Sequence, residues 1–309
     1  MHLLVSGSSG LIGTALVGAA RTRGDAVTRL VRSTSGARPS PDGVIDVSWD
    51  PARGTLDTAA LEAAGPFDGV VHLAGAGVGD RRWSPARKRE ILDSRTRSTD
   101  VLARALAALT PLPPVLVSAS AVGYYGDRGD EILTESSAPG TGFLAGVCTA
   151  WEAAAEPATS AGIRTVLLRT GIVLSASGGA LAKQLPLFRL GAGGRVGSGH
   201  QYRSWITLDD HVAVILHCLA RDDLSGPVNA TAPHPATDAE LATAIGHALH
   251  RPSFLAVPVP VLKLVLGSEM AADMVLSSQR VLPDQLERSG FPFRHPDLDE
   301  AVRSVVGGS

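Results

Sequence analysis

The sequence has few cysteines and no metal-ligand spacing. Its 309 residues include two cysteines, Cys148 and Cys218, too far apart to suggest a disulfide framework or a zinc site. His200, His211 and His217 follow neither an H-x-x-x-H nor a carboxylate pattern, so no metal site is expected. We expect both cysteines to fill space in the core, as free cysteines commonly do.

An excess of positive charge is also lacking. Lys and Arg total 28 against 30 Asp and Glu, which gives a net charge of −2. This balance excludes the basic surface that is typical of nucleic-acid-binding proteins. A small molecule is therefore the expected partner, and no nucleic acid.

Long apolar runs are missing as well. The longest late apolar stretch, residues 255–266, is interrupted by Pro258, Pro260 and Lys263 and cannot span a bilayer. The first apolar run ends at Gly7, too early for a signal peptide. We therefore expect a soluble protein of the cytoplasm with no membrane partner.

What the sequence does contain is an alternation of short β-branched runs and longer helical patterns. Strands are predicted over residues 3–6, 26–31, 69–73, 115–118 and 165–169, and helices over residues 11–23, 58–64, 85–109 and 146–161. This rhythm is typical of parallel βαβ units and predicts an α/β fold with a Rossmann-type doubly wound parallel sheet. The rhythm is lost further on, so we predict a Rossmann domain over residues 1–225 and a smaller C-terminal domain over 226–309. Residues 170–205 would contribute to the substrate-side lobe.

A glycine-rich stretch, GSSGLIG at residues 7–13, follows the first strand and opens the first helix. Gly7 permits a tight turn, Gly10 lets backbone amides approach a pyrophosphate, and Gly13 lets the helix pack closely. The helix N-terminus offers free N–H groups to phosphate oxygens. A plain glycine-rich turn is the alternative. We predict a dinucleotide site formed by Gly7, Ser9, Gly10, Leu11, Ile12 and Gly13.

The end of the second strand indicates which dinucleotide binds. A carboxylate here would bond the 2′-hydroxyl of NAD, but the strand ends Leu30-Val31-Arg32. Arg32 can instead face a 2′-phosphate as a charged, bidentate donor. The alternative is a solvated arginine. The sequence therefore favours NADP(H) over NAD(H).

The third strand runs into small residues. Leu73, Ala74 and Gly75 would leave room for the adenosine and ribose beside them. His72 is interpreted as a core or strand-end histidine and not as a catalytic base.

An arginine falls on the apolar stripe of the next helix. Arg97 has an i,i+4 partner in Asp93, whereas Arg95 has none at that spacing. An arginine that faces inward needs an anion. A cofactor phosphate or Glu90 could supply it.

The chain resembles the extended short-chain dehydrogenases/reductases through GSSGLIG, VVHLAG at residues 70–75 and SASAVGYYG at residues 118–126. More narrowly, it resembles the atypical "epimerase family protein" group, the predicted nucleoside-diphosphate-sugar epimerases. That match rests on LRTGIVL, GSGHQYRSWI, GPVNATAP, SQRVLP and GFPF, which occur in order along the chain. The resemblance implies NADP(H) binding and a cofactor lining that includes Leu73, Ala74, Glu90, Arg95 and Val173. The resemblance also makes a homodimer possible, since relatives commonly dimerise through a pair of helices.

The catalytic pair of the extended superfamily is missing. That pair is a Tyr and a Lys four residues apart on one helix, where the ammonium lowers the tyrosine pKa. The chain has three lysines, none of them four residues after a tyrosine, and the resemblance places Leu144 and Cys148 at the two positions. Ser120 remains where the superfamily serine polarises a carbonyl. Tyr124 or Tyr125 could act as an acid, although an unassisted phenol is poorly matched to neutral pH. The alternative is that these tyrosines only wall the nicotinamide pocket.

Polar residues of the glycine-rich crossover lie on the substrate side. Arg195, Gln201 and Arg203 could clamp a diphosphate of a sugar nucleotide, or be solvated loop charges. Asp209 and Asp210 are interpreted as an N-cap with a favourable dipole contact.

Two functions from different classes are compatible with these residues. One is an NADP-dependent epimerase or oxidoreductase that uses Ser120 and Tyr124 on an unknown substrate. The other is a catalytically silent NADP(H)-binding protein that senses cofactor state or docks a partner.

Overall fold

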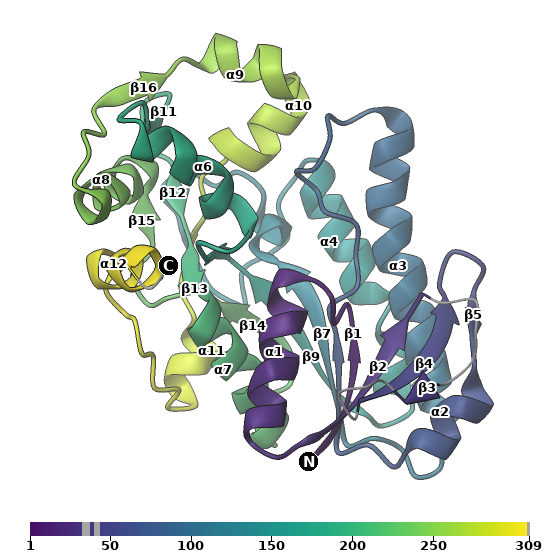
Figure 1. Ribbon diagram of the computed structural model, residues 1–309. Helices are drawn as coiled ribbons and strands as arrows, with labels where there is room; N and C mark the ends of the chain where they lie inside the picture. Colours follow the sequence, from purple (N-terminus) through teal and green to yellow (C-terminus); the bar gives the residue numbers. More distant parts are fainter. Residues whose placement is uncertain (33–37, 40–43, 308–309) are drawn as a thin grey trace.

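The computed structural model describes residues 1–32, 38–39 and 44–307, and its centre is one large sheet. Figure 1 shows the sheet with helices on both faces and a second lobe above its carboxyl edge. In spatial order the strands are β14 (Gly226–Ala230), β9 (Arg164–Thr170), β7 (Val115–Ala121), β6 (Gly69–His72), β1 (His2–Ser6), β2 (Ala26–Val31), β4 (Ile45–Asp50) and β3 (Arg38–Pro39), with β5 (Thr55–Leu56) on β4. All pairs are parallel except those of β3 and β5 with β4. The predicted doubly wound parallel sheet is confirmed.

The sheet separates two apolar clusters because successive side chains of a strand point to opposite faces. In β1, Leu3 and Val5 join one cluster and Leu4 the other. The first cluster packs against α1 (Leu11–Thr22), α7 (Leu208–Ala220) and α11 (Asp284–Arg288). The second packs against α2 (Thr58–Ala64), α3 (Pro85–Ala107) and α5 (Glu156–Ser160), with α4 (Phe143–Ala153) beside α3.

Two details differ from the sequence prediction. The helix predicted over residues 146–161 begins earlier and divides into α4 and α5, with Pro157 in the first turn of α5, where its missing N–H costs least. The strand β4 was not predicted, although Val47 and Trp49, both buried, alternate with polar residues. That period of two was the available signal.

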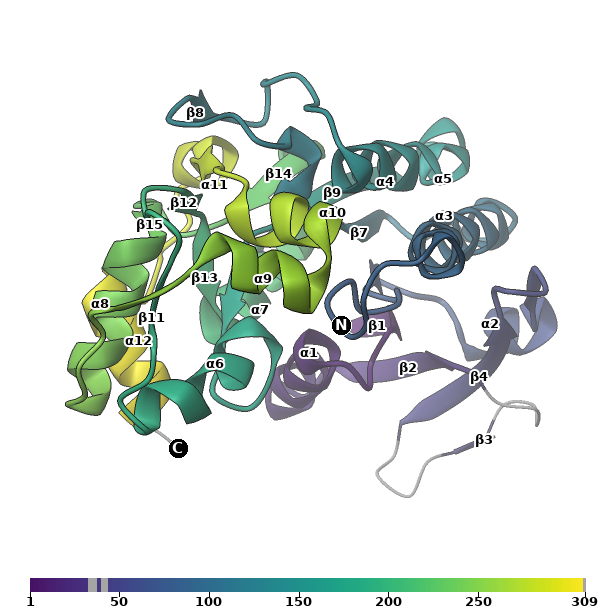
Figure 2. The same ribbon diagram turned by 90° about the horizontal axis from the view of Figure 1, so that it is seen from above.

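The second lobe has its own apolar cluster, which includes Leu185, Trp205 and Ile245. It consists of β10 (Ile172–Leu174), α6 (Gly179–Arg189), β11 (Gly194–Val196), β12 (Tyr202–Arg203), β13 (Trp205–Thr207), β15 (Ala236–Thr237), α8 (Asp238–Leu249), β16 (Leu255–Val257), α9 (Val259–Leu266), α10 (Ser268–Ala271), a π-turn η2 (Ala272–Leu276) and α12 (Leu298–Gly307). The strands form short pairs, β10 with β13, β11 with β16 and β12 with β15. Figure 2 shows this lobe beside α1 and α4.

The position of β14 bears on the domain boundary. It pairs along its whole length with β9, from Gly226 against Val166 to Ala230 against Thr170. A boundary between residues 225 and 226 would remove this strand from its sheet. We therefore propose a boundary after Ala230, with residues 172–207 already in the second lobe.

Candidate functional site

The glycine loop lies at the carboxyl end of β1 and holds two very close backbone approaches. Gly7 has φ +69°, and a Cβ on it would lie 2.6 Å from the carbonyl carbon of Leu73. A Cβ on Gly13 would lie 2.2 Å from the Gly7 carbonyl oxygen. Real Cβ atoms do not approach that closely, so both positions need glycine. The structure thus gives a physical reason for the spacing that the sequence shows.

The N-terminus of α1 is open to an anion. Its N-cap residue, Gly10, makes no side-chain cap hydrogen bond, and the first turn carries no acidic residue. Free amides and the positive end of the helix dipole therefore face the same space. Gly178, at the start of α6, lies across from Leu11, where a Cβ would be 3.1 Å from a Leu11 methyl group. These residues fit the pyrophosphate of a dinucleotide.

The strand ends on either side of the loop hold the other predicted cofactor residues. Arg32 follows β2, is exposed, and forms no ion pair with any described residue. Leu73 donates its amide to the carbonyl and the hydroxyl of Ser6, at 3.2 Å each. Ala74 and Val173 are half-buried. The carboxyl ends of β1, β2 and β6 therefore bring the glycine loop, Arg32, Leu73 and Ala74 to one edge, as parallel strands require, whereas Val173 comes from β10 of the second lobe.

Arg95 lies half-buried behind Gly75. Its Nη1 donates to the carbonyl oxygens of Ala76 at 2.9 Å and Ile91 at 3.1 Å, and its guanidinium lies 4.9 Å from the ring centroid of Trp151. Burial lowers the pKa of Arg95. No carboxylate of the described chain pairs with it, so its charge is balanced by neutral acceptors alone.

The alternative that Glu90 neutralises Arg95 is wrong. Glu90 is exposed and pairs with Arg87 at 2.7 Å and with Arg81 at 3.4 Å. The hydrogen bond from Arg87 lowers the pKa of Glu90. Arg87 is buried, donates to the carbonyl of Gly77, and has an Nε without a partner among the described residues. Sequence reasoning missed Arg87, because its position on α3 looks like an ordinary surface charge.

Ser120 belongs to a buried polar network at the end of β7. Its hydroxyl donates to Glu152 at 2.7 Å, and Glu152 also accepts from Nε and Nη2 of Arg169 at 2.8 and 2.9 Å. All three side chains are almost fully enclosed. The Ser120 hydroxyl therefore already donates its one hydrogen bond to Glu152. It could polarise a substrate carbonyl only if it rotated away from that carboxylate.

The two tyrosines of the 3-10 turn η1 (Val122–Tyr125) have different surroundings. Tyr125 is fully buried, donates to Asn229 at 2.7 Å, and accepts from Arg169 at 3.0 Å. Burial raises the pKa of Tyr125 to about 12, so its phenol is a structural group. Tyr124 is half-buried, and the guanidinium carbon of Arg169 lies over its ring, 3.5 Å from the ring centroid. Of the two, Tyr124 is the one left for a role at the site.

The positions that the resemblance assigns to the missing Tyr and Lys do face this turn. A Cβ on Gly123 would lie 3.5 Å from Leu144 Cβ and 3.7 Å from Cys148 Sγ. Burial raises the pKa of the Cys148 thiol to about 12, so the group stays neutral at physiological pH. Neither side chain replaces the acid–base chemistry of the pair.

A cavity of about 170 Å³ adjoins these positions. Asp273 of η2 closes it by accepting from the amides of Phe143 at 2.9 Å and Leu144 at 3.3 Å, at the start of α4. The cavity is lined by Gly123, Gly126, Asp127, Thr141, Gly142, Leu144, Ala145, Ala272, Asp273, Ser277 and Gln279. It lies between the large sheet and the C-terminal segment and has both polar and apolar lining residues. Sequence reasoning did not single out Asp273.

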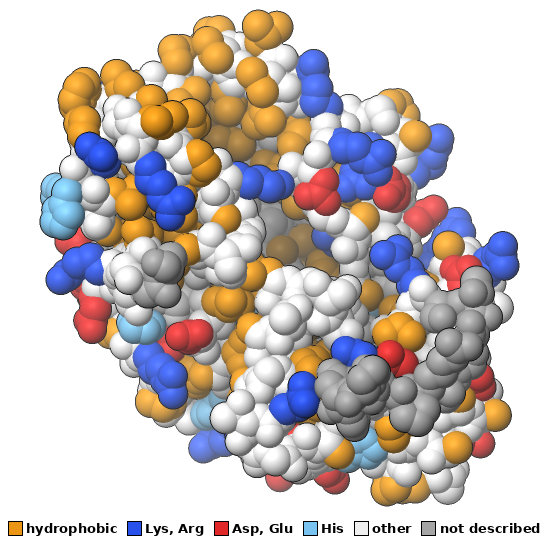
Figure 3. All heavy atoms as spheres, viewed as in Figure 1, with side chains coloured by type: hydrophobic (Ala, Val, Ile, Leu, Met, Phe, Trp, Pro, Cys, Tyr) orange, Lys and Arg blue, Asp and Glu red, His pale blue; other side chains and the backbone are white. Residues whose placement is uncertain are grey.

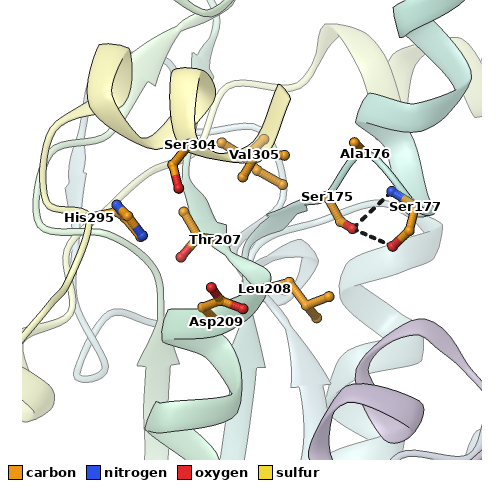
Figure 4. Close-up of a pocket in the computed structure, with 10 residues that line it drawn as sticks. Ser175, Ala176, Ser177, Thr207, Leu208, Asp209, His295, Ser304 and Val305 are labelled. Carbon is orange, nitrogen blue, oxygen red and sulfur yellow. Dashed lines mark hydrogen bonds between the residues drawn. The ribbon is translucent and has the colours of Figure 1, made fainter. Parts of the chain in front are cut away.

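A larger cavity of about 370 Å³ lies elsewhere, between α12, the start of α7 and the loop after β10 (Figure 4). Its polar lining includes Asp209, His295 and Ser304. None of the residues predicted to bind the cofactor, all of which lie in the described part of the chain, lines it. Size alone therefore does not identify the cofactor site.

The N-cap predicted at Asp209 and Asp210 is instead Thr207. Its hydroxyl accepts from the amide of Asp210 at 3.1 Å, and α7 begins at Leu208. Both aspartates lie in the first turn, where the predicted dipole contact holds. Asp210 is buried and accepts from the amides of Arg294 and His295. Its main role is therefore to fix the C-terminal segment to α7.

Two of the three crossover residues, Gln201 and Arg203, are not free to clamp a diphosphate. Arg203 is buried and pairs with Asp238 at 3.0 Å, and Gln201 donates to the Val196 carbonyl at 3.0 Å. They stabilise the second lobe, so both alternatives considered for them are wrong. Arg195 is exposed, as a solvated loop charge would be.

The sequence profile described as "NAD dependent epimerase/dehydratase family" matches residues 3–230. The chain belongs to this family. A second profile, "Domain of unknown function (DUF1731)", matches residues 257–305 of this epimerase-family protein, which span α9, α10, η2, α11 and most of α12. The predicted family resemblance is confirmed.

Relatives match the whole chain. "Epimerase family protein Mb2239" of Mycobacterium bovis is 44% identical over 96% of this chain and 95% of its own length. The crystal structure of human epimerase family protein SDR39U1 with NADPH is 33% identical and superposes with a TM-score of 0.89, covering 100% of both chains. UDP-glucose 4-epimerase from Thermus thermophilus, in complex with NAD, has a TM-score of 0.75 at 22% identity, covers 99% of this chain and 98% of its own, and shows the same fold.

Proposed function

We propose that this epimerase-family protein binds NADP(H) at the carboxyl edge of the large sheet, beside the glycine loop. The observation that carries the proposal is the open N-terminus of α1 behind a loop whose Gly7 and Gly13 admit no side chain. Arg32 follows β2 and would face a 2′-phosphate, and no carboxylate follows that strand. The NADPH complex of the human relative supports the same cofactor.

The cofactor, when bound, supplies hydride transfer, which makes an oxidoreductase or epimerase acting on a small molecule the favoured class. A sugar nucleotide is one candidate substrate, on the strength of the family alone. Ser120 and Tyr124 are the groups proposed for the reacting end. The positions of the missing pair hold Leu144 and Cys148, so the acid–base step differs from that of the extended superfamily.

A second candidate function rests on the buried network. Ser120 donates its proton to Glu152, and Arg169 covers one face of Tyr124. A protein in which both groups are structural would bind NADP(H) without turning over a substrate. It would then report cofactor state to a partner.

The first experiment is a fluorescence titration of the purified chain with NADPH and NADH. We expect tighter binding of NADPH, and an NADPH affinity about tenfold or more weaker in Arg32→Ala, with little change for NADH, because one charge-assisted contact is lost. Arg97→Ala is the matched control, since it removes an exposed arginine that pairs with Asp93 on α3. Equal affinity for the two nucleotides would contradict the NADP assignment.

Hydride exchange then separates the two functions. The natural sequence and Ser120→Ala are each tested for stereospecific exchange of the nicotinamide hydrogen with a panel of carbonyl compounds. Exchange that occurs in the natural sequence and is lost in the variant supports the enzymatic function. Partner binding that follows the redox state of the cofactor supports the silent protein.

A further inference from the structure

Large hydrophobic side chains gather on the outside of the second lobe. Most of those exposed in the described residues lie on three elements: Leu187 and Leu190 at the end of α6, Phe254 and Leu255 at β16, and Val261, Leu264 and Val265 on α9. Leu190 is 82% exposed and Leu264 is 77% exposed. We call these seven residues the apolar patch. Figure 3 shows hydrophobic side chains concentrated over this lobe.

The three elements form one continuous surface. β11 pairs with β16, so that Gly194 lies opposite Leu255. Gly191, just after α6, packs against the ring of Pro252, and Gly197 packs against Val259 at the start of α9. The patch is therefore part of the packed lobe.

Helix α9 has an unusual exposure pattern. Val261, Leu264 and Val265 are at i, i+3 and i+4, so they share one face, and that face is turned to solvent. No residue of α9 is fully buried. A surface helix normally turns its apolar face to the core. An apolar face turned outward in this way marks a contact surface.

The charges around the apolar patch have one sign. Arg189, Arg251 and Lys263 are exposed and form no ion pair with any described residue. The two stretches that build the patch, residues 176–208 and 241–268, contain no Asp or Glu. A second copy of this chain would bring like charges together, so self-association is disfavoured.

Three carboxylates that lie close to these two stretches in the sequence are already engaged. Asp238 accepts from the amide of Val196 and pairs with Arg203. Glu240 closes the capping box of α8 with Thr237. Glu269 of α10 pairs with Lys88 of α3 at 2.5 Å. These carboxylates therefore do not balance the positive charges of Arg189, Arg251 and Lys263.

We propose that the apolar patch docks on a bilayer surface that contains anionic lipid, with α9 lying in the plane of the interface. Apolar side chains next to unpaired Lys and Arg are what such a surface binds. Figure 1 shows α9 on the outer edge of the lobe, and all three apolar residues of its outward face are exposed. No helix in the described residues is long and apolar enough to cross a membrane. The contact is therefore interfacial, and it departs from the sequence-based expectation of no membrane partner.

The test is sedimentation of the full chain with vesicles. Vesicles of phosphatidylcholine alone are compared with vesicles in which about a third of the lipid is phosphatidylglycerol. We expect binding to the anionic vesicles, at least about tenfold weaker binding to the neutral ones, and a loss of binding in high salt.

Two variants test the residues. The double change Leu264→Ser and Val265→Ser should abolish vesicle binding while NADPH affinity stays unchanged. Ile132→Ser is the matched control, because Ile132 is 53% exposed on β8 (Ile132–Leu133), outside the patch, and should bind vesicles as the natural sequence does.

Three results would overturn the proposal. The first is no sedimentation with either vesicle. The second is equal binding by the double variant and the natural sequence. The third is a dimer in analytical ultracentrifugation that the double change dissociates, because a second copy would then cover the patch.

Discussion

Arg169 illustrates how single side chains decide the chemistry of this cleft. It lies at the end of β9 and contacts Glu152, Tyr125 and the carbonyl of Glu135. Burial by itself lowers the pKa of Arg169, but the hydrogen bond and charge of Glu152 outweigh it and raise the pKa. The cation is therefore permanent, and it holds Ser120 indirectly through their shared carboxylate.

Removing that carboxylate should be costly. Glu152→Gln leaves a buried arginine unpaired, and we expect the free energy of unfolding to fall by about 3–5 kcal/mol. Urea unfolding at neutral pH measures it. Asp100→Asn is the control, because Asp100 pairs with Arg104 on the exposed face of α3 and its loss should lower the free energy of unfolding far less. Similar losses in both variants would show that the buried pair contributes no more than a surface pair.

At the scale of elements, the C-terminal segment is fastened to the sheet by a few polar contacts. Asp273 of η2 accepts from two amides at the start of α4, where no residue of α4 itself supplies a side-chain cap. Met274 packs near Gly79, in the loop after β6. The segment therefore caps the helix that carries the positions of the missing catalytic pair.

Breaking this cap should loosen both elements. Asp273→Ala should lower the free energy of unfolding by about 1–2 kcal/mol and speed hydrogen exchange at the amides of Phe143 and Leu144. Asp273→Asn retains an acceptor oxygen and should lose less. Glu269→Ala is the control, because it removes a more exposed pair with Lys88 and should leave the exchange at α4 unchanged. Unchanged exchange in Asp273→Ala would mean that other contacts hold the start of α4.

At the scale of the whole molecule, two buried histidines lie at the sheet, one in a strand and one in a helix packed on it. His72 of β6 contacts Ser6 at 2.6 Å and Ser98 of α3 at 3.2 Å. His211 of α7 contacts Thr170 at 2.9 Å. Burial lowers the pKa of each imidazole to about 4. His72 is confirmed as the core histidine that the sequence indicated.

These histidines make the fold sensitive to acid. The unfolded chain binds a proton at each near pH 6.5 and the folded chain only near pH 4, so stability is present above pH 6.5 and is lost as the pH falls towards 4. From about pH 7 to pH 5 each histidine should remove about 2 kcal/mol. Urea unfolding at pH 7 and pH 5 measures how far the free energy of unfolding falls between the two. That fall should be about 2 kcal/mol smaller in His211→Gln than in the natural sequence. His200→Gln, at an exposed site, should not change the loss. An identical pH dependence in all three proteins would contradict the assignment.

Local patterns determined which elements form and where the cofactor loop lies. The strand at 26–31 and the helix at 58–64 were predicted with the bounds that the structure shows. The spacing of Gly7 and Gly13 identified the loop, because contacts only six residues apart are visible in the sequence. The absence of a lysine four residues after a tyrosine was visible for the same reason, because that spacing is also short.

Only the tertiary structure decided which side chains meet. Ser120 donates to Glu152, 32 positions away, and Asp273 bonds the start of α4 across 130 positions. The placement of β14 beside β9 and the pairing of Glu90 with Arg87 instead of Arg95 were likewise settled by packing. A sequence records which groups are polar or apolar and at what spacing. Which buried charge meets which acceptor depends on how whole elements pack, and that information is distributed over the entire chain.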